Sequence, residues 1–438
     1  MESTAYSNII NLAIEILRKY PLCDRCLGRM FARLGRDLSN KERGKALKLL
    51  IVLHLHNRIL SGDQDAIQLF KEIAPNIGRP ARGLYEELFK EELHNRNCSI
   101  CRNKLENVIT TASIIAYNKL REWDIDKFLV GARAPFETIR IEESIKTEYG
   151  LVYSESIKNE VKREVGKKLQ DYGLTVDFDN PEGVVVIDLW DPHVTVQVNP
   201  IFFKGFYWKT GRNISQSYWP TRWGLKYEFS VEQATWSLKN VMKAEKTIIH
   251  AAGREDADAR MLGTGRPLVV EVKRPRKRKI SLSEVETALN MGGKGLVHFK
   301  ITGFANRFDV RLYKNELSNI RKLYKALVVS ESPLSHTDLS RLESEFSERI
   351  IRQRTPTRVL HRRSDLERNK KVYKIKNIQV SDHVFYSFIL AEGGLYIKEL
   401  ISGDDGRTQP SFADVLNTTT YCVDLDVIGI DFDIPGHL

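Results

Sequence analysis

Acidic and basic side chains crowd into the glycine-led segment 253–260. Four of them could take part in chemistry: Arg254, Glu255, Asp256 and Asp258. A carboxylate can act as a nucleophile or a base, and a neighbouring cation keeps it ionised. The β-branched run 268–272 predicts a buried strand directly afterwards, and loops held by a rigid strand often carry catalytic residues. We therefore expect a site here, with a solvated surface turn as the alternative.

Cysteines form a second cluster, because four of the five come as two Cys-x-x-Cys pairs, Cys23/Cys26 and Cys98/Cys101. Four thiolates are the number that tetrahedral zinc requires, and such a site has no open position for catalysis. Residues 27–97 separate the pairs, so a helical insert must lie between the two Cys-x-x-Cys turns, which meet in space. We predict a structural zinc site. The alternatives are four unrelated buried cysteines or a redox pair, although no βαβ pattern surrounds either motif.

Composition favours a nucleic-acid partner. The 438 residues carry 68 Lys and Arg against 57 Asp and Glu, a net charge of +11, together with 16 Tyr, 18 Phe and 6 Trp. Cations attract phosphates, and aromatic faces stack on bases. The longest apolar runs fall short of the roughly 18 residues that cross a membrane, and the amphipathic segment 4–20 predicts a helix instead of a signal peptide. We expect a cytoplasmic protein with no membrane partner. The glycine turn 292–295 lacks the Gly-Lys-Ser/Thr of a phosphate loop, so we expect no nucleotide cofactor.

The elements that must hold the cysteines are helical. Apolar spacing predicts helices at 4–20, 41–60 and 82–94. We assign residues 1–105 to an N-terminal helical zinc-binding domain.

Residues 106–205 change to alternating helix and strand, which predicts a small α/β domain. The expected elements are helices 104–120 and 153–170 and strands 184–190 and 193–198. This region resembles the THUMP domain, an RNA-binding module of tRNA-modifying enzymes. The resemblance rests on Phe128 to Pro135 and on the valine-rich strand before Asn199-Pro200.

Residues 206–438 mix strands with helices around the charged segment. The expected helices are 230–244, 283–290 and 336–346, and the expected strands are 247–251, 268–272, 296–303, 327–330 and 421–430. A turn is expected at Gly263, Gly265 and Pro267. Aromatic residues and cations interleave at 205–224, which favours either an RNA surface or packing between domains. The basic segment 352–363 predicts an RNA contact.

Residues 253–267, Gly-Arg-Glu-Asp-Ala-Asp-Ala-Arg-Met-Leu-Gly-Thr-Gly-Arg-Pro, resemble the signature of the "Pus ten" family of tRNA pseudouridine synthases. Three further motifs of that family follow in order: Lys-x-Tyr-x-Ala at 322–326, Arg-Thr-Pro-x-Arg-Val-x-His-Arg-Arg at 354–363, and Tyr-Ile-Lys-Glu-Leu at 396–400 with Gly-Asp-x-Gly-Arg-Thr behind it. With the cysteine pairs and the THUMP-like module, the resemblance spans nearly the whole chain. It implies a multidomain α+β enzyme whose C-terminal pseudouridine-synthase domain contains a mixed, largely antiparallel sheet.

The resemblance also implies roles for single residues. Asp256 falls where pseudouridine synthases keep their catalytic aspartate, in a string similar to the Gly-Arg-Thr-Asp of the TruA group, and Asp258 ranks second. Tyr324 is similar to the tyrosine that stacks on the target uracil. Tyr396 and Lys398 stand in a motif similar to the Thr-Tyr-Ile-Arg of the TruB group, whose basic residue pairs with the catalytic aspartate. Lysine lacks the bidentate geometry of that arginine.

The implied substrate is a uridine in the TΨC arm of tRNA, at position 54 with position 55 as a second candidate. Isomerisation to pseudouridine breaks an N–C glycosidic bond and makes a C–C bond. It needs a carboxylate and a proton acceptor at C5, and neither a redox cofactor nor a metal. The target base must leave its stack, so an aromatic platform and phosphate-holding cations such as Arg254 are expected.

Two other functions fit parts of the chain. Asp258 with Glu271 and Lys273 matches the Asp…Glu-x-Lys spacing of magnesium-dependent nucleases, in which carboxylates on a strand hold the metal. A zinc-containing RNA-binding protein without catalysis is the other alternative. A chelator distinguishes the nuclease from a synthase, because removal of magnesium should abolish only the nuclease reaction.

Overall fold

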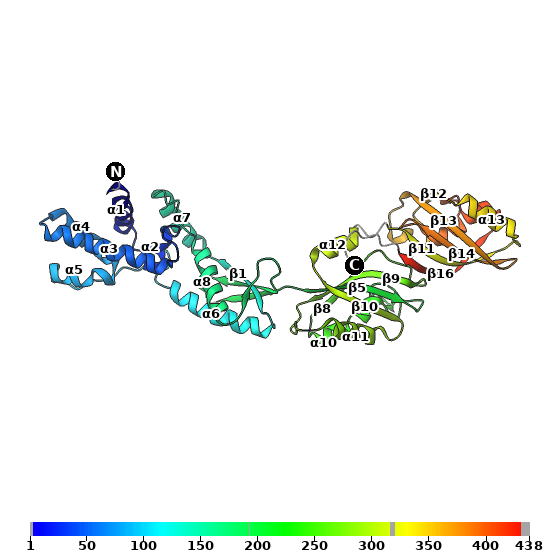
Figure 1. Cartoon of the computed structure of the whole chain (residues 1–438), viewed down its shortest axis with the longest axis horizontal. Coiled ribbons are helices and arrows are strands. Elements are labelled where there is room, and N and C mark those ends of the chain that lie inside the picture. Colours follow the sequence, from blue (N-terminus) through cyan, green and yellow to red (C-terminus); the bar gives the residue numbers. More distant parts are fainter. Residues whose placement is uncertain (1–2, 192, 316–319, 431–438) are drawn as a thin grey trace. The chain divides into compact units, whose positions relative to one another are not determined.

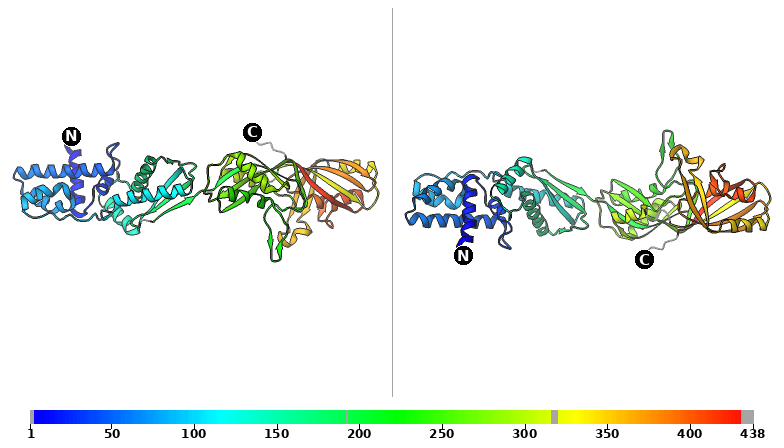
Figure 2. Two further views of the ribbon diagram at one scale, coloured as in Figure 1. Left: turned by 90° about the horizontal axis from the view of Figure 1, so that it is seen from below. Right: turned by 90° about the horizontal axis from the view of Figure 1, so that it is seen from above.

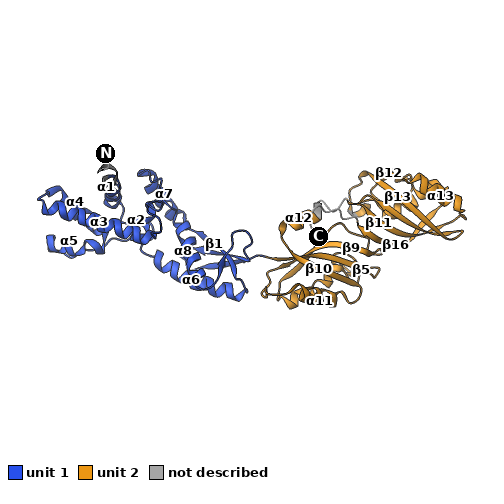
Figure 3. Cartoon of the chain, in the orientation of Figure 1, with its two compact units in different colours: residues 1–199 blue, residues 200–438 orange. Residues whose placement is uncertain are grey.

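The computed structural model describes residues 3–191, 193–315 and 320–430. Figure 1 shows its helices and strands, and Figure 3 its two compact units, residues 1–199 (unit 1) and 200–438 (unit 2). The fold is mixed α+β, as predicted. No helix within the described ranges is long and apolar enough to cross a membrane.

Unit 1 begins with helices. They are α1 (Ser3–Lys19), α2 (Asp24–Met30), α3 (Asn40–Leu60), α4 (Gln64–Ile77) and α5 (Arg82–Phe89). Helices α2 and α3 pack backbone to backbone, because a Cβ on Gly28 would lie 1.8 Å from the carbonyl oxygen of Asn40, and one on Gly44 would lie 1.8 Å from that of Asp24. Only glycine permits such an approach. This contact fixes α2, which carries Cys26.

The rest of unit 1 is a four-stranded sheet with helices against it (Figure 1). The strand order is β2 (Thr175–Val176), β1 (Lys127–Arg133), β3 (Gly183–Asp188), β4 (Val194–Val198), with β1 parallel to β2 and β3. Helices α6 (Leu105–Glu122), α7 (Phe136–Glu148) and α8 (Ile157–Asp171) accompany it. One apolar core runs from the N-terminal helices through this sheet.

Unit 2 is built on a ten-stranded sheet. One half contains β10 (Val297–Ala305), β5 (Ile201–Lys209), β9 (Arg260–Lys273) and β8 (Lys246–Ala251), with α11 (Leu282–Gly293) against β10. The other half contains β16 (Thr420–Ile430), β11 (Lys322–Ser330), β14 (Val384–Ala391), β13 (Glu367–Ser381), β12 (Arg349–Arg354) and β15 (Thr408–Gln409). The predicted boundary at residue 205 falls inside β5, which pairs with β9 and β10.

The two halves of the sheet meet where β16 pairs with β9 in parallel, Asp426 opposite Arg260 and Val427 opposite Met261. The charged segment 253–260 directly precedes β9, and β11 lies on the other side of β16. Two short helices complete this region, the 3-10 helix η2 (Thr357–Arg362) and the α-helix α14 (Ile397–Ser402). The junction therefore collects loops from distant parts of the chain.

A small hairpin stands apart from the main sheet. Strands β6 (Pro220–Thr221) and β7 (Gly224–Leu225) form it, and it projects from unit 2 (Figure 2). Trp223 at its turn is 88% exposed. Upstream in the same aromatic segment, Tyr207 and Lys209 are fully buried. The segment 205–224 thus serves packing at one end and offers an aromatic surface at the other.

Several predicted elements were wrong. The turn expected at Gly263 and Gly265 is part of the continuous strand β9, because both glycines allow close contacts: a Cβ would lie 1.7 Å from the Ile428 carbonyl oxygen and 2.8 Å from the Trp208 ring. The expected helix 230–244 is two short helices, α9 (Val231–Ala234) and α10 (Ser237–Val241), and the helix expected at 82–94 ends at Phe89. The helices that were not predicted include α2, α4 and α7.

Candidate active site and metal centre

A cavity of about 250 Å³ opens at the junction of the two sheet halves. Its walls come from the loop before β9, from β11, from η2 and from the segment leading into α14. All five predicted catalytic and substrate-binding residues line it: Arg254, Asp256, Tyr324, Tyr396 and Lys398. Residues remote in sequence thus converge on one pocket.

Asp256 lies in an ion pair that the motif comparison did not anticipate. The Nη2 of Arg358, on η2, is 2.8 Å from Oδ2 of Asp256. The Nε of the same guanidinium is 2.6 Å from Glu399 Oε1. Burial alone would lower the pKa of Arg358, but the hydrogen bond and charge of the buried Glu399, with the charge of Asp256, raise that pKa above its ordinary value. Arg358 is therefore held between one buried carboxylate and the candidate catalytic one.

Lys398 contacts Asp258 more closely than Asp256. Its Nζ is 2.5 Å from Asp258 Oδ2 and 3.9 Å from Asp256 Oδ2. Although burial alone would raise the pKa of Asp258, the hydrogen bond and charge of Lys398 hold that pKa below its ordinary value. The guanidinium at Asp256 comes from Arg358 instead. Arg358, in the basic segment 352–363, thus makes the shorter ion pair with Asp256, and Lys398 lies at the limit of ion-pair distance from it.

A buried lysine holds the loop that carries Asp256. Lys209 is fully buried on β5, and its ammonium donates to the carbonyl oxygens of Ile214 at 2.9 Å, Asp256 at 2.9 Å and Ala257 at 3.2 Å. Two of these acceptors follow the Asp256 side chain directly, so the buried cation fixes the backbone on that side of it. The same ammonium lies 3.5 Å from Glu255, which compensates its charge.

Glu255 points inward and joins this support. Its carboxylate accepts from Arg266 Nε at 2.9 Å and from the Tyr207 hydroxyl at 3.0 Å. Burial opposes ionisation, but the charges of Arg266 and Lys209 hold the pKa of Glu255 below its ordinary value. Burial and the Glu255 charge raise the pKa of Tyr207, which therefore stays a hydroxyl donor. Both adjacent acids line the cavity, but Glu255 is buried and held by Arg266 and Tyr207, whereas Asp256 is half-buried and pairs with Arg358.

Tyr324 and Lys322 reach the cavity from β11. They are two positions apart on one strand and so share a face. Tyr324 is 7% exposed, and burial raises its pKa to about 12, against the opposing charge of Arg266. A Cβ on Gly253 (φ +79°) would lie 3.0 Å from Lys322 Nζ and 3.2 Å from Arg266 Nη1. Glycine at 253 therefore leaves room for two cations beside the loop that carries Asp256.

The rim of the cavity is basic. Arg254 is exposed and has neither an ion pair nor a hydrogen bond within the described part of the chain. Arg363 donates to the Tyr396 hydroxyl at 2.8 Å. Both cations stand where an anionic ligand would meet them before entering the cavity.

The residues of the nuclease alternative do not form one cluster: Glu271 lies 3.8 Å from Lys273, but Asp258 pairs with Lys398. Glu271 and Lys273 are absent from the cavity walls, and Glu271 hydrogen-bonds to His250 at 2.8 Å. Within the described ranges, one group of side chains has the make-up and spacing of a metal site, and it is the cysteine cluster. No observation favours the nuclease reading.

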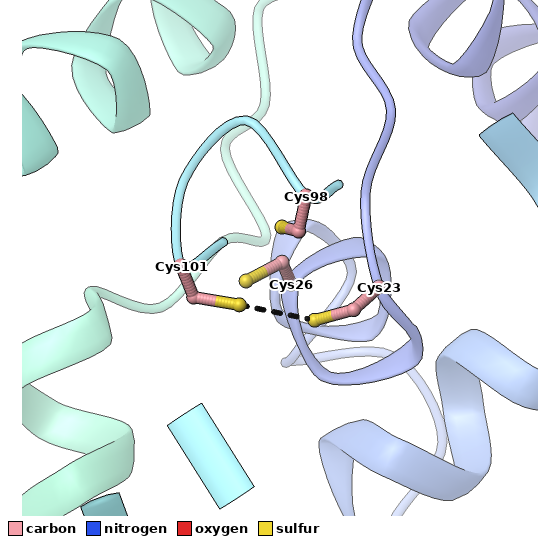
Figure 4. A group of neighbouring side chains, drawn as sticks. All are labelled: Cys23, Cys26, Cys98 and Cys101. Carbon is pink, nitrogen blue, oxygen red and sulfur yellow. Dashed lines mark hydrogen bonds between the residues drawn. The ribbon is translucent and has the colours of Figure 1, made fainter. Parts of the chain in front are cut away.

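The four cysteines come together in unit 1 (Figure 4). All four Sγ atoms lie within 4.8 Å of one another, and Cys23 Sγ is 3.4 Å from Cys101 Sγ. Tetrahedral zinc with bonds of about 2.3 Å sets its sulfurs roughly 3.8 Å apart. Three of the cysteines are buried and Cys23 is half-buried. The donor set and its spacing therefore fit a closed tetrahedral metal site.

An arginine links the cysteine cluster to the sheet region of unit 1. Arg29 is fully buried on α2 and its Nη2 donates to Cys26 Sγ at 3.5 Å. Its other nitrogens meet Glu142 of α7 and Glu160 of α8, each at 2.9 Å. The sequence pattern gave no indication of this network, because its members lie in three helices, two of which, α2 and α7, were not predicted.

Two family models match parts of this chain, and curated relatives match nearly all of it. A family model described as "Pus10, C-terminal" matches residues 202–431, and one described as "Pus10 THUMP domain, archaeal" matches 114–188. The tRNA pseudouridine synthase Pus10 of Aeropyrum pernix is 48% identical over 98% of this chain and 99% of its own length. The protein of that name from Ignisphaera aggregans is 46% identical over 96% and 98%. A chain of a solved Cbf5-Nop10-Gar1 complex aligns with 17% identity over 52% of this chain and 49% of its own, at a TM-score of 0.31, which carries no structural argument.

Proposed function

Since this chain belongs to the Pus10 family and is a tRNA pseudouridine synthase, we propose that it isomerises uridine 54 in the TΨC arm of tRNA, with uridine 55 as a second target, and that Asp256 is its catalytic aspartate. The observation that carries the assignment of Asp256 is its ion pair with Arg358 in a cavity that Tyr324 also lines. The guanidinium fixes the position of the carboxylate at the point where a reacting atom would sit.

Each cavity residue then has a place in the reaction. The target uridine leaves its stack and enters the cavity, where Tyr324 packs against the uracil. The carboxylate of Asp256 acts at the ribose or at the base while the glycosidic bond breaks and uracil turns to present C5 to C1′. Tyr396 and Lys398 contact the nucleotide from α14. Arg254 and Arg363 hold flanking phosphates at the rim, since exposed guanidinium groups bind phosphate bidentately.

The N-terminal parts bind the rest of the tRNA in this proposal. We assign residues 1–105 to a zinc-binding region and 106–205 to the THUMP-like module, with the catalytic domain behind them. Zinc, held by Cys23, Cys26, Cys98 and Cys101, would stabilise the fold and leave no open position for chemistry. Because zinc needs reduced thiolates, we place the protein in the cytoplasm.

Tritium release tests the catalytic assignment. tRNA transcript labelled with [5-³H]uridine is incubated with wild type and with Asp256→Asn, in EDTA after zinc has been bound. Wild type should release tritium and leave the RNA intact, whereas the variant should fall by at least about 10³-fold, because the reacting carboxylate is gone. Transcripts with cytidine at position 54 or 55 then locate the target. Equal release by both proteins would remove Asp256 from the mechanism.

Two other outcomes would point elsewhere. Intact RNA with no release from wild type would mean that a partner is missing or that the protein only binds RNA. RNA cut only after magnesium is restored would establish the nuclease.

A further inference from the structure

Lys322 is a buried amine without a partner at the active site. It is 5% exposed and lines the cavity. Within residues 3–191, 193–315 and 320–430, no group accepts a hydrogen bond from its Nζ and no carboxylate lies at ion-pair distance. The other buried cations of this region do have partners, Lys209 in three carbonyls and Arg266 in Glu255. An unpaired buried lysine is costly, so its presence beside the reacting groups calls for a chemical reason.

The surroundings of Lys322 favour a neutral amine. Its Nζ and Arg266 Nη1 both approach Gly253, on the loop that carries Asp256. Burial, followed by the charge of Arg266, lowers the pKa of Lys322 to about 7, while Glu255 opposes this shift and Lys370 adds to it. Around the same cavity stand Arg254, Arg358, Arg363, Lys398, Tyr324 and Asp256. Most of these neighbours are cations, and they disfavour a further positive charge.

We propose that the Lys322 amine is the base that removes the C5 proton of the target uracil and returns a proton to N1. The inference deepens the proposed function and rests on it. Lys322 and Tyr324 share one face of β11, so an amine stands beside the ring position that Tyr324 is proposed to cover. Tyr324 itself is a poor base, because its hydroxyl is protonated at neutral pH.

The step balances without a co-reactant. Once the C5–C1′ bond has formed, C5 carries both the ribose and its original hydrogen. That hydrogen leaves as a proton to the Lys322 amine, and the electron pair of the C–H bond forms the C5–C6 double bond. The electrons of the C6–N1 double bond return to N1, which takes a proton from the Lys322 ammonium. The amine is regenerated, and the product is an isomer of the substrate.

The experiment separates this last step from the earlier ones. Lys322→Met keeps the length of the side chain and removes the amine. Single-turnover tritium release from [5-³H]uridine tRNA should fall by about 10²-fold or more in this variant. tRNA that carries 5-fluorouridine at the target has no C5 proton to lose, so formation of its rearranged nucleotide, followed by mass spectrometry of digests, should stay within about threefold of wild type. Lys325→Met is the matched control on the opposite face of β11 and should leave both rates unchanged.

Two further readouts distinguish a base from a merely structural residue. Wild-type tritium release should rise with pH through about 7, because the amine must be unprotonated, and this limb should be missing in Lys322→Met. Small primary amines should restore release to Lys322→Ala, more strongly as their basicity increases.

The outcomes also separate this inference from the proposed function. No tritium release from wild type would sink the proposed function itself. Wild-type activity with an unchanged Lys322→Met would overturn only the role of Lys322. Equal losses on uridine and 5-fluorouridine would show that the amine positions the substrate, and would overturn the inference as well.

Discussion

Each unit contains a buried cation beside its candidate site, Arg29 in unit 1 and Lys322 in unit 2, but the two cations differ in whether a carboxylate pairs with them. In unit 1 the buried guanidinium of Arg29 meets two carboxylates at 2.9 Å each. In unit 2 the amine of Lys322 is almost as buried and faces a cavity without such a partner in the described structure. A paired cation ties elements together, whereas an unpaired one lowers stability and persists where chemistry uses it. Removing the two should therefore change stability in opposite directions.

The largest effect should come from the thiolates beside Arg29. Cys98→Ser in the full chain should abolish zinc retention and expose α2 and segment 98–105 to hydrogen exchange, since structural zinc contributes on the order of 10 kcal/mol to folding. Exchange in β9 should not change. Cys422→Ser, a half-buried cysteine of unit 2, is the control and should keep one zinc per chain. Full zinc content in Cys98→Ser would contradict the metal centre.

Arg29→Met should destabilise unit 1 by roughly 3–5 kcal/mol, because it leaves Glu142 and Glu160 buried without their cation. Urea unfolding followed by hydrogen exchange of α8 measures the change. Arg18→Met removes an arginine whose pair with Glu72 is exposed, and it should leave the urea midpoint almost unchanged. A small effect at Arg29 would mean that water reaches the two carboxylates.

Lys322→Met should stabilise unit 2 by roughly 2–4 kcal/mol at pH 7. The folded pKa of about 7 lies below the unfolded value near 10.4, so the unfolded chain binds more protons between these pH values and wild-type stability rises with pH across that window. The advantage of the variant should thus shrink towards pH 10. Urea unfolding of both proteins at pH 7 and pH 10 tests this, with Lys325→Met as control. A destabilised variant would mean that Lys322 has a partner when the protein is free.

Asp258→Asn should have the smallest effect. The Asp258 side chain is 56% exposed, so its pair with Lys398 should contribute less than about 1 kcal/mol. Tritium release should fall less than tenfold, far less than in Asp256→Asn, because the neighbouring acid remains in place. Losses of equal size would show that the two aspartates share the work and that Asp256 does not act alone.

Some of this site could be predicted from the sequence and some could not. The β-branched run 268–272 predicted a buried strand, and the two Cys-x-x-Cys motifs predicted a four-sulfur cluster, since both signals are local. The turn predicted at Gly263 and Gly265 was wrong, because a glycine indicates a turn and a close backbone contact equally well. The pair between Asp256 and Arg358 joins two irregular segments, and its formation depends on how β9, β16 and η2 meet.

The same limit applies to Lys322. In the sequence it is one lysine of a Lys-x-Tyr-x-Ala motif, and lysines usually lie at the surface. Only the strand order, with β11 next to β16 and β16 next to β9, places it under the loop that carries Asp256. Burial and the lack of a partner are properties of the assembled sheet, so no local pattern records them.

The long sequence distance between the two Cys-x-x-Cys pairs has a consequence for the order of events during translation. Cys23 and Cys26 leave the ribosome first, and roughly 70 more residues must follow before Cys98 and Cys101 appear. At a synthesis rate of about 5–20 residues per second, the early pair stays several seconds without the other two thiols that complete the metal site. Helices α3 and α4 can form in that interval, so the metal would close a loop that is already largely built. Nascent chains released before residue 101 should consequently hold zinc weakly, and chains released after unit 1 is complete should hold it firmly.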